Sequence, residues 1–355
     1  MDQRLKDSFA RLHLAHVGQY SVLSVDPPIF YVQFWLDALE QFLPGYRLLF
    51  DHLRGRKAYC LCCYSWNITQ QVLRDVQQLE QRRQAEFPDI EFVHLCNEPG
   101  QVEQFDAFGA RAIYCSQNSF VDESAFRLLP DREKRFDAVY NSRLTPWKRH
   151  VLAAEISRLA VIYYPSPHDS REASEEIRRR LAHAYYLNHP GGAEYRYLSR
   201  EEINRGLNAA RTGLCLSAEE GAMYASMEYL LAGLPIVTTT SQGGRDVFFE
   251  PDFVATVEAD PGAVRAAVEE LPGRAPAAED IRARTLAKVW QHRDRFIELV
   301  QSIYDAHGAA RDFRGEWPRV FHHGMTRTTS HLETIALLRQ AEARGQRMTP
   351  PEGQR

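Results

Sequence analysis

Two glutamates, Glu220 and Glu228, lie eight positions apart in the most informative stretch of the chain. Ser217–Thr240 reads S-A-E-E-G-A-M-Y-A-S-M-E-Y-L-L-A-G-L-P-I-V-T-T-T. We predict a helix over residues 222–232 that is apolar on nearly every side and therefore buried. A carboxylate in such a helix is costly without a polar partner, so Glu228 should face hydroxyl or amide donors. A ribose diol would supply two charge-assisted hydrogen bonds, as it does in dinucleotide-binding folds.

Glu220 and Gly221 lie at the predicted turn between a strand over 213–217 and this helix. The backbone amides of Gly221, Ala222 and Met223 would then be free at a helix start, which suits an anion such as a diphosphate. Glycine also lets an anion approach the backbone closely. The alternative interpretation is structural: the first glutamate interacts only with the helix dipole, and the second pairs with a neighbouring arginine.

Two basic residues lie upstream, in a loop that follows another predicted strand. Asp137–Lys148 reads D-A-V-Y-N-S-R-L-T-P-W-K, which places Arg143 and Lys148 five positions apart. Ligands of open α/β sheets bind at the carboxyl ends of the strands, so both cations should reach that edge. A guanidinium holds phosphate oxygens in a fork, and a lysine adds a mobile charge. Together with the carboxylates and the amides, they favour a sugar nucleotide over a simple solvated loop.

Short apolar runs alternate with longer amphipathic segments, the pattern of an α/β protein with parallel sheets. In the amino-terminal part we predict strands at 12–17, 58–64, 91–95 and 112–116, and helices at 30–42, 69–85 and 101–108. After a break at 129–136 we predict strands at 137–140, 160–164, 194–197, 213–217, 236–239 and 254–257, a long helix at 281–307, and a disordered polar tail from Met348.

Composition excludes several function classes. The 355 residues suggest two domains, and 44% hydrophobic with 25% charged residues is ordinary for a globular protein. A net charge of −4 provides no electrostatic basis for binding nucleic acid. No apolar run is long enough to span a membrane and the polar start M-D-Q-R-L-K is not a signal peptide, so we expect a cytoplasmic protein.

Three other features have a structural interpretation that we prefer, and a fourth leaves a membrane contact open. The six cysteines (Cys60, Cys62, Cys63, Cys96, Cys115 and Cys215) lack metal-site spacing and are expected to be reduced, buried thiols. His322 and His323 are adjacent and have no carboxylate cluster beside them, and Arg178–Arg180 is expected to be a solvated helix end. The basic segment Asp51–Lys57 leaves open a peripheral contact with the inner face of a membrane.

These segments resemble the family 4 glycosyltransferases, which are retaining enzymes. The family pattern of a strand, G-R-L, a short loop and K-G is similar to residues 142–149. Its E-G-F-G, second glutamate and A-x-G-x-P-V-V match residues 220–237, and its following glycine pair and acidic residue resemble 243–246. Its N-G-V-D-x-x-x-F phrase has a counterpart at 118–126. The resemblance covers residues 118–271.

The resemblance implies an α/β protein of the GT-B fold, with two Rossmann-like domains facing across a cleft and the amino-terminal one compressed. We expect an acceptor-side domain at 1–135, a donor domain at 136–310, and a helical extension with a polar tail at 311–355. The implied reaction moves a sugar from a nucleotide-diphosphate sugar, such as a UDP- or GDP-sugar, to an unidentified glycan, lipid-linked glycan or small molecule.

The resemblance also implies a role for each matched residue. Arg143 and Lys148 would hold the donor diphosphate and stabilise the leaving group, with no divalent metal and no other cofactor. Glu228 would bind the ribose, and Glu220 would contact the donor sugar. The amides of Gly221, Ala222 and Met223 would hold sugar hydroxyls or phosphate. Catalysis would be mainly electrostatic and positional, with Glu220, Lys148 and Arg143 as the catalytic group.

The chain departs from the family pattern at several positions. Ser142 stands in place of a glycine, and Ala222–Met223 in place of Phe-Gly. Gly18 is our candidate for the family's glycine-rich acceptor loop. His94 is our candidate for the histidine that touches the donor sugar, with a core histidine as the alternative. Contacts to the base are expected from backbone at 197–199.

Three function classes remain on the sequence alone. The first is a catalytic glycosyltransferase. The second is an accessory subunit that keeps the fold without turnover, although the complete set of Arg143, Lys148, Glu220 and Glu228 disfavours it. The third is a sugar-nucleotide epimerase or phosphorylase on the same architecture.

Overall fold

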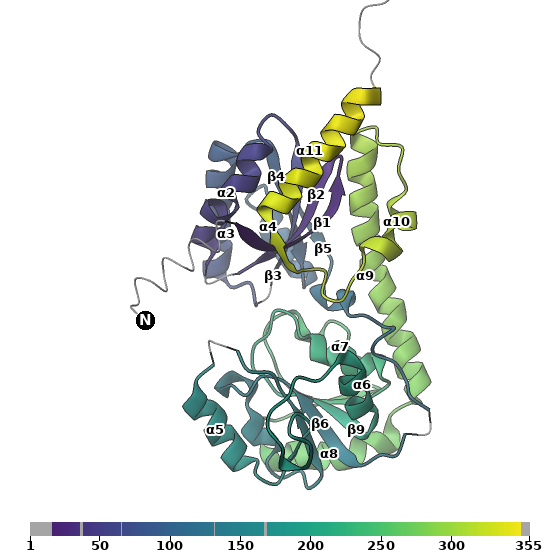
Figure 1. The fold of residues 1–355 in the computed structure, drawn as a ribbon. Coiled ribbons are helices and arrows are strands. Elements are labelled where there is room, and N and C mark those ends of the chain that lie inside the picture. Colours follow the sequence, from purple (N-terminus) through teal and green to yellow (C-terminus); the bar gives the residue numbers. More distant parts are fainter. Residues whose placement is uncertain (1–15, 36–37, 65, 131, 167–168, 349–355) are drawn as a thin grey trace, which may run out of the picture. The chain divides into compact units, whose positions relative to one another are not determined.

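The chain forms two compact α/β units. The computed structural model describes residues 16–348 except 36–37, 65, 131 and 167–168 (Figure 1). Unit 1 consists of residues 1–120 and 293–355, and unit 2 of residues 121–292. Helix α9 (Ala278–Ala306) begins in unit 2 and ends in unit 1. The contacts therefore group residues 293–310 with unit 1, whereas the sequence prediction assigned them to the second domain.

Unit 1 is built on a six-stranded sheet with the order β12-β1-β2-β3-β4-β5. Strands β2 to β5 run parallel, whereas β1 is antiparallel to both of its neighbours. The strands are β1 (Val17–Val25), β2 (Pro28–Phe34), β3 (Ala58–Tyr64), β4 (Ile90–Cys96), β5 (Ala112–Tyr114) and β12 (Thr328–Ser330). The helices are α2 (Phe42–His52), α3 (Gln70–Glu86), α4 (Pro99–Asp106), α10 (Phe313–Val320), α11 (His331–Met348) and the second part of α9.

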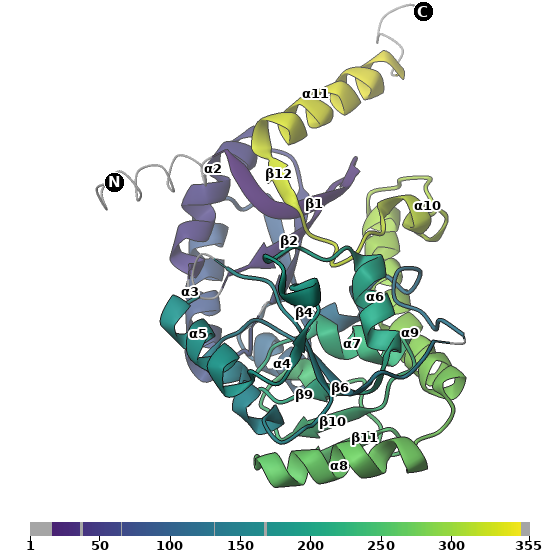
Figure 2. The ribbon, with the colours of Figure 1, turned by 60° about the horizontal axis from the view of Figure 1, so that its bottom comes forward.

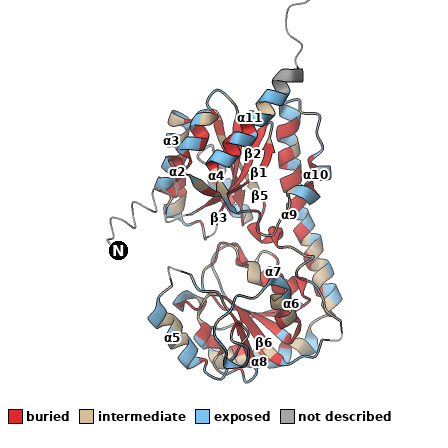
Figure 3. Cartoon of the chain, viewed as in Figure 1, coloured by how far each residue is buried: buried red, intermediate tan, exposed pale blue. Residues whose placement is uncertain are grey.

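Each face of this sheet buries its own apolar cluster. Alternate strand residues such as Phe30 and Cys60 pack with α2, α3, α4 and α11. The intervening residues, such as Tyr31 and Leu61, pack against α9 and α10. The strands are accordingly buried along nearly their whole length, as Figure 3 shows. A sheet covered on both faces gives continuous apolar strands, so the three layers follow from the composition of β2, β3 and β4.

The beginning of unit 1 differs from the sequence prediction. The helix expected at 30–42 is wrong, because residues 28–34 form β2 and the helix α2 starts only at Phe42. A short apolar run bounded by turns is compatible with either structure, and here pairing with β1 and β3 decides in favour of the strand. The strand expected at 12–17 lies mostly outside the described residues, as does the tail beyond Met348.

Unit 2 has a six-stranded parallel sheet with the order β11-β10-β9-β6-β7-β8. Figure 2 shows β6, β9, β10 and β11 with α8 covering them on one side. The strands are β6 (Phe136–Asn141), β7 (Leu159–Ile162), β8 (Tyr185–Tyr186), β9 (Ala210–Cys215), β10 (Ile236–Thr239) and β11 (Val254–Val257). The helices are α5 (Arg171–Arg180), α6 (Arg200–Asn208), α7 (Tyr224–Leu231), α8 (Pro261–Arg274) and the first part of α9.

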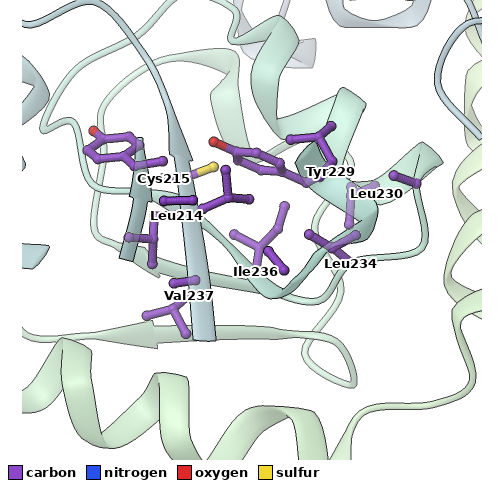
Figure 4. Close-up of a cluster of buried hydrophobic side chains, with 14 of the residues drawn as sticks. Leu214, Cys215, Tyr229, Leu230, Leu234, Ile236 and Val237 are labelled. Carbon is purple, nitrogen blue, oxygen red and sulfur yellow. The ribbon is translucent and has the colours of Figure 1, made fainter. Parts of the chain in front are cut away.

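Helix α7 is placed by close packing on β9 and by a glycine at its end. Tyr229 lies against Gly213, where an added Cβ would come within 2.5 Å of the tyrosine ring. Leu230, Leu234 and neighbouring strand residues complete this part of the core (Figure 4). Gly233 ends the helix with φ of 73°, a conformation that favours glycine. The predicted helix ending at Gly233 is confirmed.

Most other predicted elements of unit 2 are confirmed, but one strand is wrong. Residues 194–197 form no strand, and the edge strand is instead β8, which pairs with β7. Tyr195 packs with Tyr163 and His189, so side-chain packing holds this segment rather than sheet pairing. Among the described helices none has the length and apolarity needed to span a bilayer.

All six cysteines are free and buried, as expected. Burial raises the pKa of each thiol, so these groups stay protonated near neutral pH. Within the described parts of the chain, no group of three or more His, Cys, Asp or Glu side chains is arranged to hold a metal ion.

Candidate functional site

The loops at the carboxyl edge of the unit 2 sheet bring most of the predicted residues together. The loop after β6 holds residues 142–149, and the loop after β9 holds residues 216–223. The second loop is fixed to the loop after β10, because Glu219 forms a parallel bridge with Gln242. The amide of Glu220 donates to the carbonyl oxygen of Gln242 over 2.9 Å. This connection is the local reason that Glu220 has a defined position.

Lys148 and Glu220 form an ion pair across two of these loops. The ammonium of Lys148 donates to Oε1 of Glu220, and the two side chains are 12% and 5% exposed. The hydroxyl of Tyr140, at the end of β6, donates to the carbonyl oxygen of Lys148. The sequence predicted that both residues belong to one site, and they are in direct contact. The contact is largely removed from water, which strengthens the attraction between the two charges.

Arg143 is held by a carboxylate that the sequence did not single out. Its guanidinium pairs with Asp169 through Nη2 and Oδ1, and its Nε lies 3.4 Å from Oδ2 of the same residue. Asp169 also accepts the amide of Ser166 over 2.8 Å. The guanidinium lies 5.4 Å from the centroid of the Trp147 ring. Arg143 keeps 25% of its side chain exposed, so part of its donor set remains available to a ligand.

Glu228 lies in a mostly apolar setting with one side-chain partner among the described residues. Nδ2 of Asn141, the last residue of β6, donates to Oε2 over 2.7 Å. Asn141 is positioned in turn by Tyr229, whose hydroxyl accepts its backbone amide over 2.6 Å. Burial raises the pKa of Glu228 to about 7, against smaller lowering effects from Asn141 and Arg200. The expected combination of burial and a polar donor is present, and the donor is an amide of the protein.

Ser142 and His150 form a second buried contact in the loop after β6. Oγ of Ser142 lies 3.0 Å from Nε2 of His150, and both side chains are buried. The imidazole packs on Tyr140 with ring centroids 4.5 Å apart. Burial and the nearby charge of Lys148 lower the pKa of His150 to about 3, so the ring is neutral near pH 7.

A fully buried arginine connects the ends of two strands at the same sheet edge as the site. Arg245 donates to the carbonyl oxygens of Cys215, Ser217 and Thr239 over 2.7–3.1 Å. Its Nε donates to Asp246 over 2.6 Å. All its contacts are to the protein, so Arg245 joins the ends of β9 and β10 and does not offer its charge to a ligand.

Tyr164 is a half-exposed aromatic side chain close to the charged residues. It is 52% exposed and lies two positions after the last residue of β7. Its pKa is raised, first by burial and then by the negative charges of Glu228, Glu220 and Asp169, while Arg143 opposes the shift. Four charged residues of the candidate site therefore act on one hydroxyl.

The turn before α7 follows β9 as predicted, but the helix starts two residues later than the expected Ala222. Helix α7 begins at Tyr224 with Met223 as its N-cap residue. Among the described residues, the backbone amides of Gly221 and Ala222 donate no hydrogen bond to another backbone group. These two amides therefore remain open to an anion or a hydroxyl at the start of the helix.

Two candidates from the amino-terminal part require correction. His94 is fully buried, with Nδ1 2.5 Å from the hydroxyl of Tyr64 and Nε2 2.9 Å from Glu80. Its ring stacks on Phe105, so His94 is a core residue and cannot touch a sugar in this structure. Gly18 is also not in a loop, because it lies in β1 and pairs with Thr329 of β12.

The local packing explains why a glycine stands at position 18. An added Cβ would lie 2.6 Å from the hydroxyl oxygen of Tyr46 and 2.9 Å from the ring of Tyr20. The close approach of two tyrosines, not an acceptor, accounts for this residue. The sequence could not distinguish these cases, because a glycine near a strand end is compatible with both.

Three residues of the site were missed from the sequence. Asn141 carried a signal, because it ends a predicted strand at the ligand-binding edge. Asp169 and Tyr164 carried none, since both enter the site from the loop between β7 and α5 and only the fold brings them to Arg143.

Comparison with known proteins identifies the fold. Neither protein-family models nor curated protein sequences match this chain. Solved structures do match. A sucrose-phosphate synthase from Thermosynechococcus elongatus has a TM-score of 0.55 at 14% identity, covering 76% of this chain and 79% of the other. The Anabaena protein HepE in complex with UDP has a TM-score of 0.53 at 16% identity, covering 75% and 84%.

A third structure belongs to the same group of matches. It is an α,α-trehalose-phosphate synthase (UDP-forming) from Burkholderia xenovorans in complex with glucose-6-phosphate, with a TM-score of 0.52 at 15% identity, covering 77% and 74%. At these identities the similarity establishes architecture. The chain has the GT-B fold, as the resemblance of its motifs implied.

Proposed function

We propose that this protein is a retaining glycosyltransferase related to family 4, which transfers a sugar from a nucleotide-diphosphate sugar without a divalent metal. The acceptor is a glycan, a lipid-linked glycan or a small molecule. The observation that carries the proposal is the meeting of Arg143, Lys148, Glu220 and Glu228 at one sheet edge of a GT-B fold.

The charges of the site suit the parts of a sugar nucleotide. Lys148 and Arg143 lie on one loop and would receive the diphosphate, with the open amides of Gly221 and Ala222 as further donors. Glu228 has a single side-chain partner in the described part of the chain, so its remaining acceptor capacity suits the ribose hydroxyls. Similar structures have been solved with UDP and with UDP-glucose, which supports a nucleotide-sugar donor.

The proposed chemistry is mainly electrostatic. Departure of the sugar leaves negative charge on the diphosphate, and two cations fixed before the reaction stabilise that charge at no cost of reorganisation. Glu220 holds Lys148 in place, and we assign it the contact with the donor sugar that the resemblance implies. The two cations thus take over the neutralisation that a divalent metal would otherwise supply.

The acceptor side rests on less direct support. The basic segment 51–57 was considered for contact with an anionic membrane surface. In unit 1 its cations are paired with acids, Arg54 with Asp51, Arg56 with Glu342 and Lys57 with Glu91. This pairing favours an acceptor that binds away from residues 51–57. A cytoplasmic site of action agrees with a glycan, a lipid-linked glycan or a small molecule as the acceptor.

The test is turnover with a panel of UDP- and GDP-sugars and mixed carbohydrate acceptors, assayed by nucleotide release with and without a chelator. We expect release that depends on both donor and acceptor, survives chelation, and yields a product with the donor's anomeric configuration by NMR. An inverted product would contradict the retaining mechanism, and loss of activity on chelation would contradict metal independence.

The same assay separates the alternatives. Binding of a nucleotide without turnover of any donor would indicate an accessory subunit. Conversion of a sugar nucleotide without a carbohydrate acceptor would indicate an epimerase, and phosphate-dependent cleavage of a glycan would indicate a phosphorylase.

A further inference from the structure

We propose that Ser142 and His150 act as a positioning pair that sets the placement of Arg143 and Lys148 for a diphosphate. The proposal rests on the proposed function and deepens it, because it assigns phosphate positioning to two residues that touch no ligand themselves. Its basis is that both ends of the cation-bearing loop are fixed through these two side chains.

The contact between the two side chains joins Ser142, the first residue of the loop, to His150, which follows the last residue of the loop. Ser142 is anchored to the sheet, because its amide donates to the carbonyl oxygen of Ile162 over 3.0 Å. Oγ of Ser142 then meets Nε2 of His150 at 3.0 Å. Arg143 directly follows the first residue, and Lys148 lies two positions before the second. Any displacement of either partner therefore moves one of the two cations.

The imidazole also connects the loop to the core. His150 packs on the ring of Tyr140, and the hydroxyl of Tyr140 donates to the carbonyl oxygen of Lys148. Inside the loop the backbone hydrogen bonds are short-range, from Thr145 to Arg143, from Lys148 to Thr145 and from Arg149 to Pro146. Such turns fix the shape of the loop, whereas the contacts of His150, together with those of the Arg149 side chain to Leu216 and Thr239, fix its position on the sheet.

Packing on Tyr140 alone does not account for a histidine at this position. A phenylalanine would pack there as well and would avoid the desolvation cost of buried ring nitrogens, but it could not meet Oγ of Ser142. The ring is also neutral beside Lys148, so it neither repels the lysine nor competes with it for phosphate.

The test uses two replacements of His150 that differ in reach. In His150→Gln the side-chain amide extends to the position of Nε2 and can still meet Ser142, whereas in His150→Asn it extends only to that of Nδ1. Ser142→Ala removes the other partner. For each protein we would measure the Kd of the nucleoside diphosphate that wild type binds best, the Kd of the corresponding monophosphate, and the unfolding temperature.

Ser142→Ala and His150→Asn should each weaken diphosphate binding about tenfold, the effect of one buried hydrogen bond, with monophosphate binding within about twofold. His150→Gln should restore most of the loss. The double variant Ser142→Ala, His150→Asn should be no weaker than either single variant. A matched control is His183→Asn, because His183 makes one hydrogen bond, to Ile156, in another part of unit 2.

Other outcomes overturn the proposal. Equal loss for both nucleotides would indicate that the pair has only a structural role, as would equal behaviour of the glutamine and asparagine variants. Unchanged diphosphate binding in Ser142→Ala would exclude the pair directly. If wild type binds no nucleotide at all, the proposed function fails, and that result is distinct from a failure of the positioning pair.

Discussion

The two sheets carry different chemistry at their carboxyl edges. In unit 2 the edge holds cations and carboxylates that meet across loops, such as Lys148 and Glu220. In unit 1 the corresponding edge holds buried amides. Nε2 of Gln117 donates to Gln33 over 2.9 Å, and Asn97 accepts the amide of Gln117 over 2.9 Å. Charged groups suit a diphosphate and amides suit neutral hydroxyls, so the two edges are not interchangeable.

The same contrast appears between two buried titratable residues, one in each unit. Both ring nitrogens of His94 have partners, and a flat aromatic ring covers its face. Among the residues that the structure describes, Glu228 has one side-chain partner, and burial raises its pKa to about 7. The number of unsatisfied bonding positions separates a structural group from a binding group, and burial by itself does not.

The largest effect is expected for Arg245, because its buried donors are bonded within unit 2 and it therefore has a structural role. Arg245→Met would leave the carbonyl oxygens of Cys215, Ser217 and Thr239 without their donor. Breaking such a buried charged network should lower the free energy of unfolding by about 3–5 kcal/mol. Denaturant unfolding measures this free energy, and a variant as stable as wild type would contradict the structural role of Arg245.

Lys148→Ala should reduce kcat by about 10²–10³-fold, because under the proposed function it removes a cation that stabilises the leaving group. Glu220 loses its partner, so the unfolding temperature should fall slightly while the fold remains. Steady-state kinetics of sugar transfer provide the measurement. Lys288→Ala is the control, since that lysine pairs with Glu250 elsewhere in unit 2. A comparable kcat loss in the control would remove the distinction between the two lysines.

Glu228→Gln tests the role of Glu228 through the pH dependence of protein stability. A carboxyl group with a pKa raised from 4.5 to about 7 binds its proton more tightly in the folded state. The stability of wild type should therefore fall as the pH rises from about 4.5 through about 7, by about 3 kcal/mol in total, and stay level above. The glutamine variant lacks this dependence, so it should be the more stable protein at pH 8 and nearly equal to wild type at pH 4.

Binding should respond in the opposite direction. Ribose hydroxyls donate to the ionised carboxylate, so affinity for a sugar nucleotide should rise as Glu228 ionises and should be about tenfold weaker in Glu228→Gln at pH 8. A sugar nucleotide is the right probe, because its phosphates lack the terminal group that titrates near pH 6. Parallel pH profiles of the two proteins in calorimetry would contradict the ribose assignment.

The smallest functional effect is expected at His94. His94→Phe leaves the hydroxyl of Tyr64 without its partner and leaves Glu80 paired with Arg83 alone, which should cost about 1–3 kcal/mol of stability. Because the ring is fully buried, nucleotide affinity should match that of wild type in the same calorimetric titration. Weakened donor binding in a folded variant would restore His94 as a ligand contact.

The sequence predicted unit 2 better than unit 1, for physical reasons. Strands β6, β9 and β10 are followed by loops with distinctive residues. Helix α7 ends at Gly233, whose positive φ favours glycine at that position. The segment 28–34 had no such marker. It is a short apolar run next to another, and only its pairing with β3 shows that it is a strand.

For the site, residues on one continuous segment were predictable and their partners were not. Arg143 and Lys148 share a loop, and Glu220 and Glu228 share a turn and helix, so their spacing carried information. Asp169 reaches Arg143 across 26 positions from a loop with no motif of its own. A contact of this kind depends on the order of strands in the sheet, which a single sequence does not specify.

The pairing of β12 with β1 has a consequence for how the protein is made. Ser330 pairs with Val17, and the hydroxyl of Tyr20 lies 2.8 Å from that of Thr334, so one edge of this sheet joins residues more than 300 positions apart. Unit 2 is a single continuous segment whose contacts are complete long before residues 328–334 leave the ribosome. Synthesis therefore releases a folded unit 2 while unit 1 still lacks its edge strand, and β1 needs protection from other chains until β12 arrives.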